Sequence, residues 1–131
     1  MKKVRGYIFS RTFVGERVPQ HVQNIIIRDY CKKNSLDYLL SASEYKMKNS
    51  FLILSDLISN FNDIFGIVAY SLFQLPGDYN ERNKILGKII KKKKVIFFAV
   101  EQMKVSNLEE QNNINSIWEI KKILSLSPQK I

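Results

Sequence analysis

The apolar positions of the chain fall into two kinds of pattern, one typical of buried strands and one typical of amphipathic helices. Runs of β-branched and aromatic residues predict strands at residues 4–9, 37–41, 64–70 and 95–100. Between these runs, apolar residues recur every three or four positions and predict helices at residues 19–33, 51–61, 79–91 and 107–124. The third run is almost entirely apolar, which favours a central strand covered on both faces.

Three of the predicted helices carry N-terminal capping signals. Asp78 can cap the third helix, and either Asn49 or Ser50 can cap the second. Ser106 and Glu109 fit a capping box at the start of the fourth helix, in which each side chain accepts a hydrogen bond from the backbone amide of the other residue.

The first predicted helix begins at Pro19, because proline has no amide hydrogen to leave unpaired in a first helical turn. Its expected buried stripe consists of Val22, Ile25, Ile26 and Tyr30. The buried candidates of the fourth helix are Leu108, Ile114, Ile117, Trp118 and Ile120.

The alternation of strands and helices predicts an α/β fold made of parallel βαβ units with right-handed crossovers. We expect a three-layer sandwich around a mostly parallel four-stranded sheet, with strand order 2-1-3-4. The length predicts a single domain at residues 1–124, followed by a disordered tail at residues 125–131.

The composition is that of an ordinary globular protein, with 45% hydrophobic and 25% charged residues, and its formal net charge is +9. Such a charge favours an anionic partner, but most of the lysines are scattered, which is typical of solvated helix faces. One run, at residues 91–94, is the exception. No apolar run is long enough to span a membrane, so we expect no membrane span.

The N-terminal region does not resemble a secretion signal, because Arg5, Ser10 and Arg11 interrupt the apolar stretch. We therefore expect a cytoplasmic protein. Cys31 is the single cysteine and is expected to be a small buried hydrophobic residue. No metal or cofactor is expected, because no histidines, cysteines or carboxylates have metal-ligand spacing and no glycine-rich phosphate loop is present.

Polar residues follow the ends of the predicted strands, where open α/β sheets bind their ligands. The candidate acid–base or nucleophilic groups are Ser10, His21, Glu44 and Glu101. The candidate substrate-binding groups are Arg11, Arg17, Gln20, Gln23, Asn24, Ser41, Tyr70, Ser71 and Gln74. The sequence leaves structural alternatives open for four of them: a surface or capping His21, a turn Ser10, a helix-capping or lysine-paired Glu101, and a core Tyr70.

The stretch GYIFS resembles the first strand of the serine recombinase catalytic domain, the family of resolvases and invertases, whose nucleophilic serine would correspond to Ser10. Gln23 resembles a glutamine of that family's first helix. The stretch YSLFQLPGD resembles a segment whose usual form is close to KLDRLGRD. The resemblance spans residues 4–103 and implies a resolvase-like or flavodoxin-like fold.

The chain differs from that family at the positions of its catalytic residues. Ile8, Gln74 and Gly77 stand where the family has arginines, and Phe73 stands where it has an acid. Those arginines stabilise the transferring phosphate, so the resemblance implies the fold without DNA strand exchange. We also expect no helix-turn-helix domain within these 131 residues.

A second resemblance covers most of the chain. The stretches RGYIFSR, IRDYC, YLLSASEY, YSLFQLP and AVE, together with RVPQH, are similar to a small bacterial family named for sporadic carbohydrate clusters. Its members are encoded among surface-polysaccharide genes. The resemblance implies a role in making a lipopolysaccharide or capsule sugar, and it implies no particular reaction.

Three functions remain open from the sequence. The first is an enzyme that isomerises, epimerises or eliminates on a phosphorylated or nucleotide-linked sugar. The second is a non-catalytic accessory subunit of a neighbouring sugar-biosynthesis enzyme. The third, nucleic-acid binding, is the least favoured, because no aromatic platform interleaves with the lysine run. Homo-oligomerisation is also expected, with Trp118 as a candidate contact.

Overall fold

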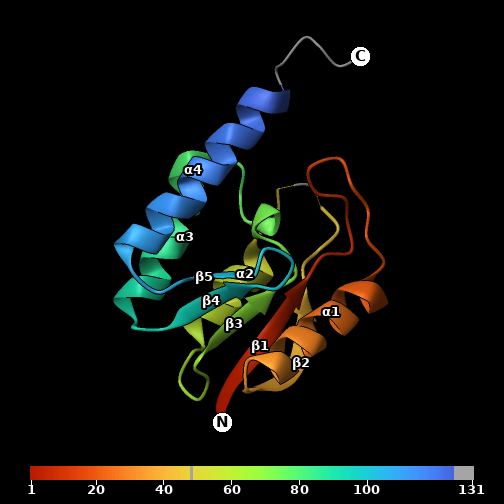
Figure 1. Ribbon diagram of the computed structural model, residues 1–131, viewed down its shortest axis with the longest axis vertical. Coiled ribbons are helices and arrows are strands. Elements are labelled where there is room, and N and C mark those ends of the chain that lie inside the picture. Colours follow the sequence, from red (N-terminus) through yellow and green to blue (C-terminus); the bar gives the residue numbers. More distant parts are fainter. Residues whose placement is uncertain (48, 126–131) are drawn as a thin grey trace.

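The chain alternates strands and helices in the predicted order in the computed structural model, which describes residues 1–47 and 49–125 (Figure 1). The strands are β1 (Lys2–Ile8), β2 (Leu36–Ser43), β3 (Gly66–Ala69), β4 (Val95–Phe98) and β5 (Met103–Val105). The helices are α1 (Gln20–Lys33), α2 (Leu52–Ser59), the short 3-10 helix η1 (Leu72–Gln74), α3 (Tyr79–Lys91) and α4 (Leu108–Ser125). The predicted tail lies outside the described residues, except for Ser125, which ends α4.

The five strands form one sheet with the order β2-β1-β3-β4-β5. The first four strands are parallel and follow the predicted order 2-1-3-4, which confirms the fold class. β5 pairs antiparallel with β4 and was not predicted. Its three residues, with exposed Lys104 in the middle, are too few to show a strand pattern in the sequence.

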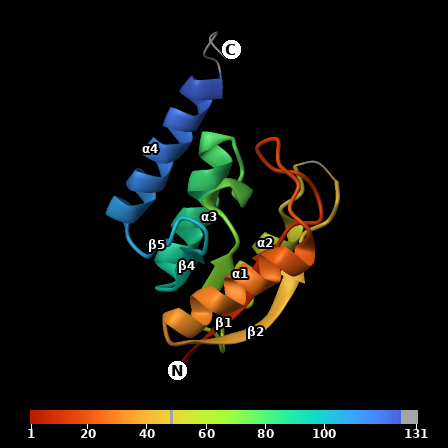
Figure 2. The ribbon, with the colours of Figure 1, turned by 45° about the vertical axis from the view of Figure 1, so that its right-hand side comes forward.

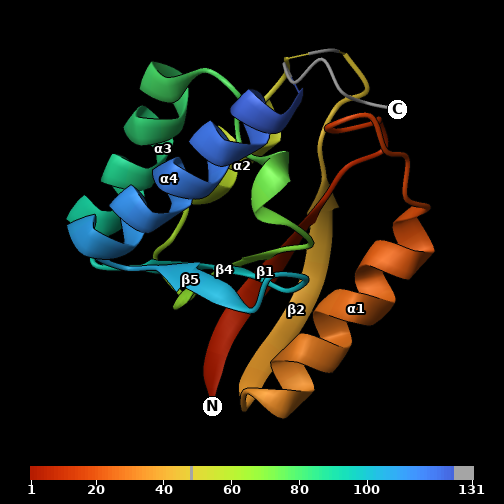
Figure 3. The ribbon, with the colours of Figure 1, turned by 45° about the horizontal axis from the view of Figure 1, so that its top comes forward.

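Helices cover the two faces of the sheet unequally. Among the described helices, α1 covers one face, over β1 and β2, whereas α2, α3 and α4 pack on the other face (Figures 2 and 3). The larger core therefore lies on the three-helix side and contains the aromatic side chains of Tyr7, Phe9 and Phe98. The smaller core lies under α1 and contains Ile27 of that helix together with Val4 and other residues of the sheet.

The buried stripe of α1 differs from the predicted one. Gln23, Ile27 and Cys31 face the sheet, whereas the side chains of Ile25 and Ile26 are 59% and 37% exposed. Three consecutive isoleucines cannot all face one side of a helix, and the sequence does not show which one does. Cys31 is a buried small residue as expected, and burial raises the pKa of its thiol to about 11.

Asp78 caps α3 as predicted, accepting a hydrogen bond from the Glu81 amide at 3.0 Å. The predicted capping box of Ser106 and Glu109 does not form, and Asn107 caps α4 instead. Asn107 accepts from the Glu110 amide at 2.9 Å, and the Glu110 carboxylate accepts from the Ser106 amide at 2.7 Å. Trp118 and Ile114 of α4 are buried in the core, whereas Leu108 and Ile120 are exposed. Trp118 therefore belongs to the domain interior and not to a surface for oligomerisation.

Candidate functional site

Two glutamines occupy the point where the crossovers from β1 and β3 diverge. The Gln23 carboxamide accepts from the Phe9 amide and donates to the Phe9 and Val18 carbonyls, all within 2.8–2.9 Å. Gln74 donates to Gln23 at 2.9 Å and accepts from the backbone amide of Tyr70 at 3.0 Å. Both side chains are at most 1% exposed. They tie the ends of β1 and β3 together, so neither is positioned to bind a substrate.

Glu44, a predicted acid–base group, is 2% exposed and accepts five hydrogen bonds. The Tyr7 hydroxyl donates at 2.7 Å, and the amides of Ile53 and Leu54 in the first turn of α2 donate at 3.2 Å. Burial and the Glu44 carboxylate raise the pKa of Tyr7. Glu44 thus caps α2 from the end of β2, where Asn49 or Ser50 was expected to do so, and its role is structural.

The Arg11 guanidinium also points back into the protein. It donates to the carbonyls of Tyr45 and Ser50 at 2.8 Å and to that of Met47 at 3.1 Å. It also lies 4.2 Å from the centroid of the Phe9 ring. Arg11 therefore fixes the loop before α2, and only part of its donor capacity remains for a ligand.

One alternative for Glu101 was that it caps a helix. It does so, but the helix is η1 and not α4. Its carboxylate accepts from the Ser71 hydroxyl at 2.7 Å and from the Leu72 amide at 2.9 Å. The neighbouring Tyr70 ring packs edge-to-face on Phe13 at 6.1 Å between centroids. Burial, with Glu16 and Glu101 nearby, raises the pKa of the Tyr70 phenol.

Three of the remaining candidates, Gln20, Asn24 and Ser41, lie where α1 contacts β2. Asn24 accepts from the Ser41 hydroxyl at 2.6 Å, and Gln20 donates to Ser43; both contacts join α1 to β2. Ser10 donates only to the Glu44 carbonyl, at 3.3 Å. Arg17 and His21 are exposed and make no hydrogen bond or ion pair with the described residues. Within the described residues, no hydrogen bond joins the side chains of Ser10, His21, Glu44 and Glu101 to one another, and His21 is a surface residue.

The loop after β1 folds back on itself through a tight turn. Phe13 and Glu16 exchange two backbone hydrogen bonds of 2.9 Å around Val14 and Gly15, whose φ angles are +44° and +80°. Two consecutive left-handed residues are the geometry of a two-residue hairpin turn. The turn brings the Phe13 ring to 5.6 Å from that of Phe9, in an edge-to-face contact.

This turn forms one wall of a pocket of about 500 Å³ at the carboxyl edge of the sheet. We call it the edge pocket. Its lining residues are Phe9, Arg11, Thr12, Phe13, Val14, Lys46, Asn49, Phe51, Phe73, Leu75, Gly77 and Trp118. Phe73 and Trp118 meet edge-to-face at 5.1 Å, and the Lys121 ammonium lies 5.6 Å from the Phe73 ring. Among the described lining residues there is no carboxylate and no histidine.

The aromatic walls of the edge pocket were not predicted, because the prediction rested on polar residues that follow the strands, and among these candidates, all within the described residues, only Arg11 lines it. Phenylalanines at positions 13, 51 and 73 were the available signal. Within the described residues, no three histidines, cysteines or carboxylates are close enough to hold a metal ion. None of the described helices is long and apolar enough to cross a membrane.

The fold is similar to that of serine recombinase catalytic domains. The N-terminal catalytic domain of the TP901-1 integrase superposes with a TM-score of 0.61 and 13% sequence identity, over 92% of this chain and 98% of that chain. A resolvase family site-specific recombinase from Streptococcus pneumoniae gives a TM-score of 0.62 and 10% identity, over 91% and 88% of the two chains. The sequence matches no protein-family model and no curated protein. The similarity is one of fold, and the carbohydrate role stays a prediction.

Proposed function

We propose that this protein is a non-catalytic binding domain on a recombinase-like fold, and that its edge pocket takes a phosphorylated or nucleotide-linked sugar. The observation that carries the proposal is the lining of the pocket, which combines aromatic rings with Arg11 and Lys46 and contains no described histidine or carboxylate. Such a lining suits binding better than the isomerisation, epimerisation or elimination that the sequence left open.

The two kinds of lining residue suit the two parts of such a ligand. Aromatic rings pack against the apolar faces of a sugar ring or a nucleobase. Lys46 and the remaining donors of Arg11 supply positive charge for a phosphate, and Lys121 stands beside Phe73. The sequence resemblance to carbohydrate-cluster proteins supports the same ligand class.

The residues that replace the recombinase arginines support a function other than strand exchange. Gln74 is held in the buried amide pair, and Ile8 is 5% exposed within the core. A Cβ atom on Gly77 would meet the Trp118 ring at 3.7 Å, so this position forms part of the pocket wall. None of the three side chains can neutralise a transferring phosphate.

The test is a thermal-shift screen of the purified chain against sugar phosphates and nucleotide sugars, with duplex DNA as a control. A ligand at ~100 times its Kd stabilises the folded state by about 2.7 kcal/mol, which raises the Tm measurably. We expect Lys46→Glu to weaken the Kd at least tenfold, and Lys88→Glu on α3 to leave it unchanged. A shift with DNA alone, or equal effects of the two substitutions, would contradict the proposal.

A role as an accessory subunit is the second candidate. It is favoured by the last turns of α4, where Ile120, Ile123 and Leu124 are 57–62% exposed. Apolar side chains gathered on one surface indicate a contact with another protein chain. If the role holds, adding the chain to a sugar-biosynthesis enzyme that it binds should raise kcat, and Ile120→Glu should abolish the increase. Sedimentation of the isolated chain would show whether the same surface forms the expected homo-oligomer.

A further inference from the structure

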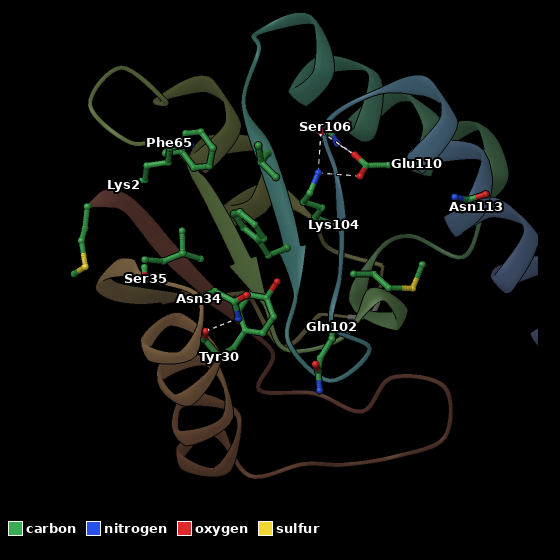
Figure 4. Close-up of a pocket in the computed structure, with 15 residues that line it drawn as sticks. Lys2, Tyr30, Asn34, Ser35, Phe65, Gln102, Lys104, Ser106, Glu110 and Asn113 are labelled. Carbon is green, nitrogen blue, oxygen red and sulfur yellow. Dashed lines mark hydrogen bonds and ion pairs between the residues drawn. The ribbon is translucent and has the colours of Figure 1, made fainter.

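The face of the sheet that carries α1 is only partly covered. α1 packs over β1 and β2, and beside it a groove of about 1020 Å³ runs over β4 and β5 (Figure 4). Its apolar floor comes from Tyr30, Leu36, Phe65, Val95 and Phe97, which belong to the core on the α1 side of the sheet. None of these residues lines the edge pocket, so the two sites can be tested independently.

The floor contains a row of aromatic rings that ends beneath a cation. The Phe97 ring lies 6.0 Å from that of Tyr30 and 6.2 Å from that of Phe65. The Lys2 ammonium stands 4.2 Å above the Phe65 ring (Figure 4). Within the described residues, no carboxylate lies within ion-pair distance of Lys2. This lysine is therefore positioned to pair with a negative group brought by a binding partner.

The opposite rim of the groove carries the second lysine, Lys104 on β5. Its ammonium pairs with Glu110 at 2.9 Å, and its side chain remains exposed. Glu110 is the one carboxylate among the described lining residues. The rim is thus positive on balance, in agreement with the net charge of +9 for the chain.

The dimensions of the groove suit a helix. A helix with its side chains is ~10 Å across and rises ~1.5 Å per residue, so a volume of about 1020 Å³ takes roughly 13 Å, or two to three turns. The position also mirrors α1, which covers the neighbouring half of the same face.

We propose that this groove binds an acidic amphipathic helix of a partner protein. The apolar stripe of that helix would cover Phe65, Phe97 and Tyr30, and carboxylates beside the stripe would reach Lys2 and Lys104. This is the helix-in-groove mode of recognition, with charge complementarity at the rim that sets partner choice.

The test is a selection against the full chain from a displayed library of 14-residue helical peptides. Apolar residues vary at positions i, i+3, i+4 and i+7, and the other positions vary among Glu, Gln and Lys. We expect the enriched peptides to carry more Glu than Lys. A fluorescein-labelled copy of the best peptide then gives the Kd by anisotropy.

Lys2→Glu should weaken that Kd at least tenfold, and Phe65→Ala should do the same. Lys3→Glu is the matched control, because the adjacent residue carries the same charge and does not line the groove; it should change the Kd by less than twofold. Selection of neutral or basic peptides, no enrichment at all, or equal effects of Lys2→Glu and Lys3→Glu would overturn the proposal. So would a dimer of this chain that Lys2→Glu dissociates, or a single-stranded oligonucleotide whose binding Phe65→Ala abolishes.

Discussion

The carboxyl edge of the sheet contains two neighbouring regions, one formed by polar side chains and the other mainly by aromatic ones. One is a set of buried polar side chains, Gln23, Gln74 and Glu44, which make most of their hydrogen bonds to the backbone. The other is the edge pocket, a hollow walled by rings and bordered by cations. The difference teaches that a dense polar stretch after a strand can serve the fold itself, while the ligand surface is formed by apolar residues beside it.

The largest expected effect is that of removing the buried Glu44 carboxylate. Glu44→Ala leaves the Tyr7 hydroxyl and the first amides of α2 without their acceptor in the interior. We expect it to lower the free energy of unfolding by about 4 kcal/mol, because each unsatisfied buried donor costs about 1–3 kcal/mol. Urea unfolding measures this, with the exposed Glu16→Ala as control. A loss below about 1 kcal/mol would mean that Glu44 is not the structural group described above.

Gln23→Ala should have the next largest effect, about 3 kcal/mol, since it leaves backbone groups of Phe9 and Val18 unpaired. Gln20→Ala, one turn earlier in α1, should change the stability by less than about 0.5 kcal/mol, because its side chain contacts only Ser43 at the surface. If the two variants lost equal unfolding free energy in urea, the buried hydrogen bonds of Gln23 would be no more important for stability than the surface contact of Gln20.

Phe73→Ala tests the edge pocket. The ring is half-buried against Trp118, so we expect a stability loss of only about 1–2 kcal/mol. Ligand affinity should fall at least tenfold, as measured by calorimetry with the ligand found in the thermal-shift screen. Leu40→Ala, an exposed position on β2, should affect neither quantity. Unchanged affinity in Phe73→Ala would exclude this ring as a pocket wall in solution.

The smallest expected effect is a change in the response to alkali. Burial raises the pKa of Tyr7 above its ordinary value of 10.0, so near pH 10 the unfolded phenol ionises while the folded one stays protonated. The contribution of Tyr7 to stability is therefore complete below pH 10 and decreases as the pH rises further. Tyr7→Phe should make the decline in unfolding free energy between pH 9 and 11 shallower. An unchanged slope would indicate that Tyr7 is accessible to water in the native state.

The fold could be predicted because its signals are local and repeated. The apolar runs around Ile67 and Ile96 identify central strands, and Asp78 identifies the start of a helix by its own hydrogen bond. The face of α1 could not be predicted, because the isoleucines at 25–27 satisfy more than one helical register. β5 could not be predicted, because a strand of three residues is too short to show an alternation of apolar and polar positions.

The candidate site was harder to predict because a side chain's role depends on its partners. Glu44 and Arg11 have the residue types of an active site, yet their partners are Tyr7, Leu54 and carbonyls near Tyr45, which only the fold brings together. Burial could not be inferred for a carboxylate that lies in a stretch of polar residues. Phe73 marked the edge pocket in the sequence only as a departure from the recombinase pattern.

The hydrogen bond between the buried side chains of Gln23 and Gln74 also has a consequence for the order of folding. It joins residues 51 positions apart, so it forms only after β1, α1 and β3 have docked, and closing a loop of that length opposes it entropically. The amides of Phe9 and Tyr70, which donate to these glutamines, should exchange with deuterium only when the whole sheet opens. Their exchange rates would then report the global unfolding equilibrium from the point where the two halves of the sheet meet.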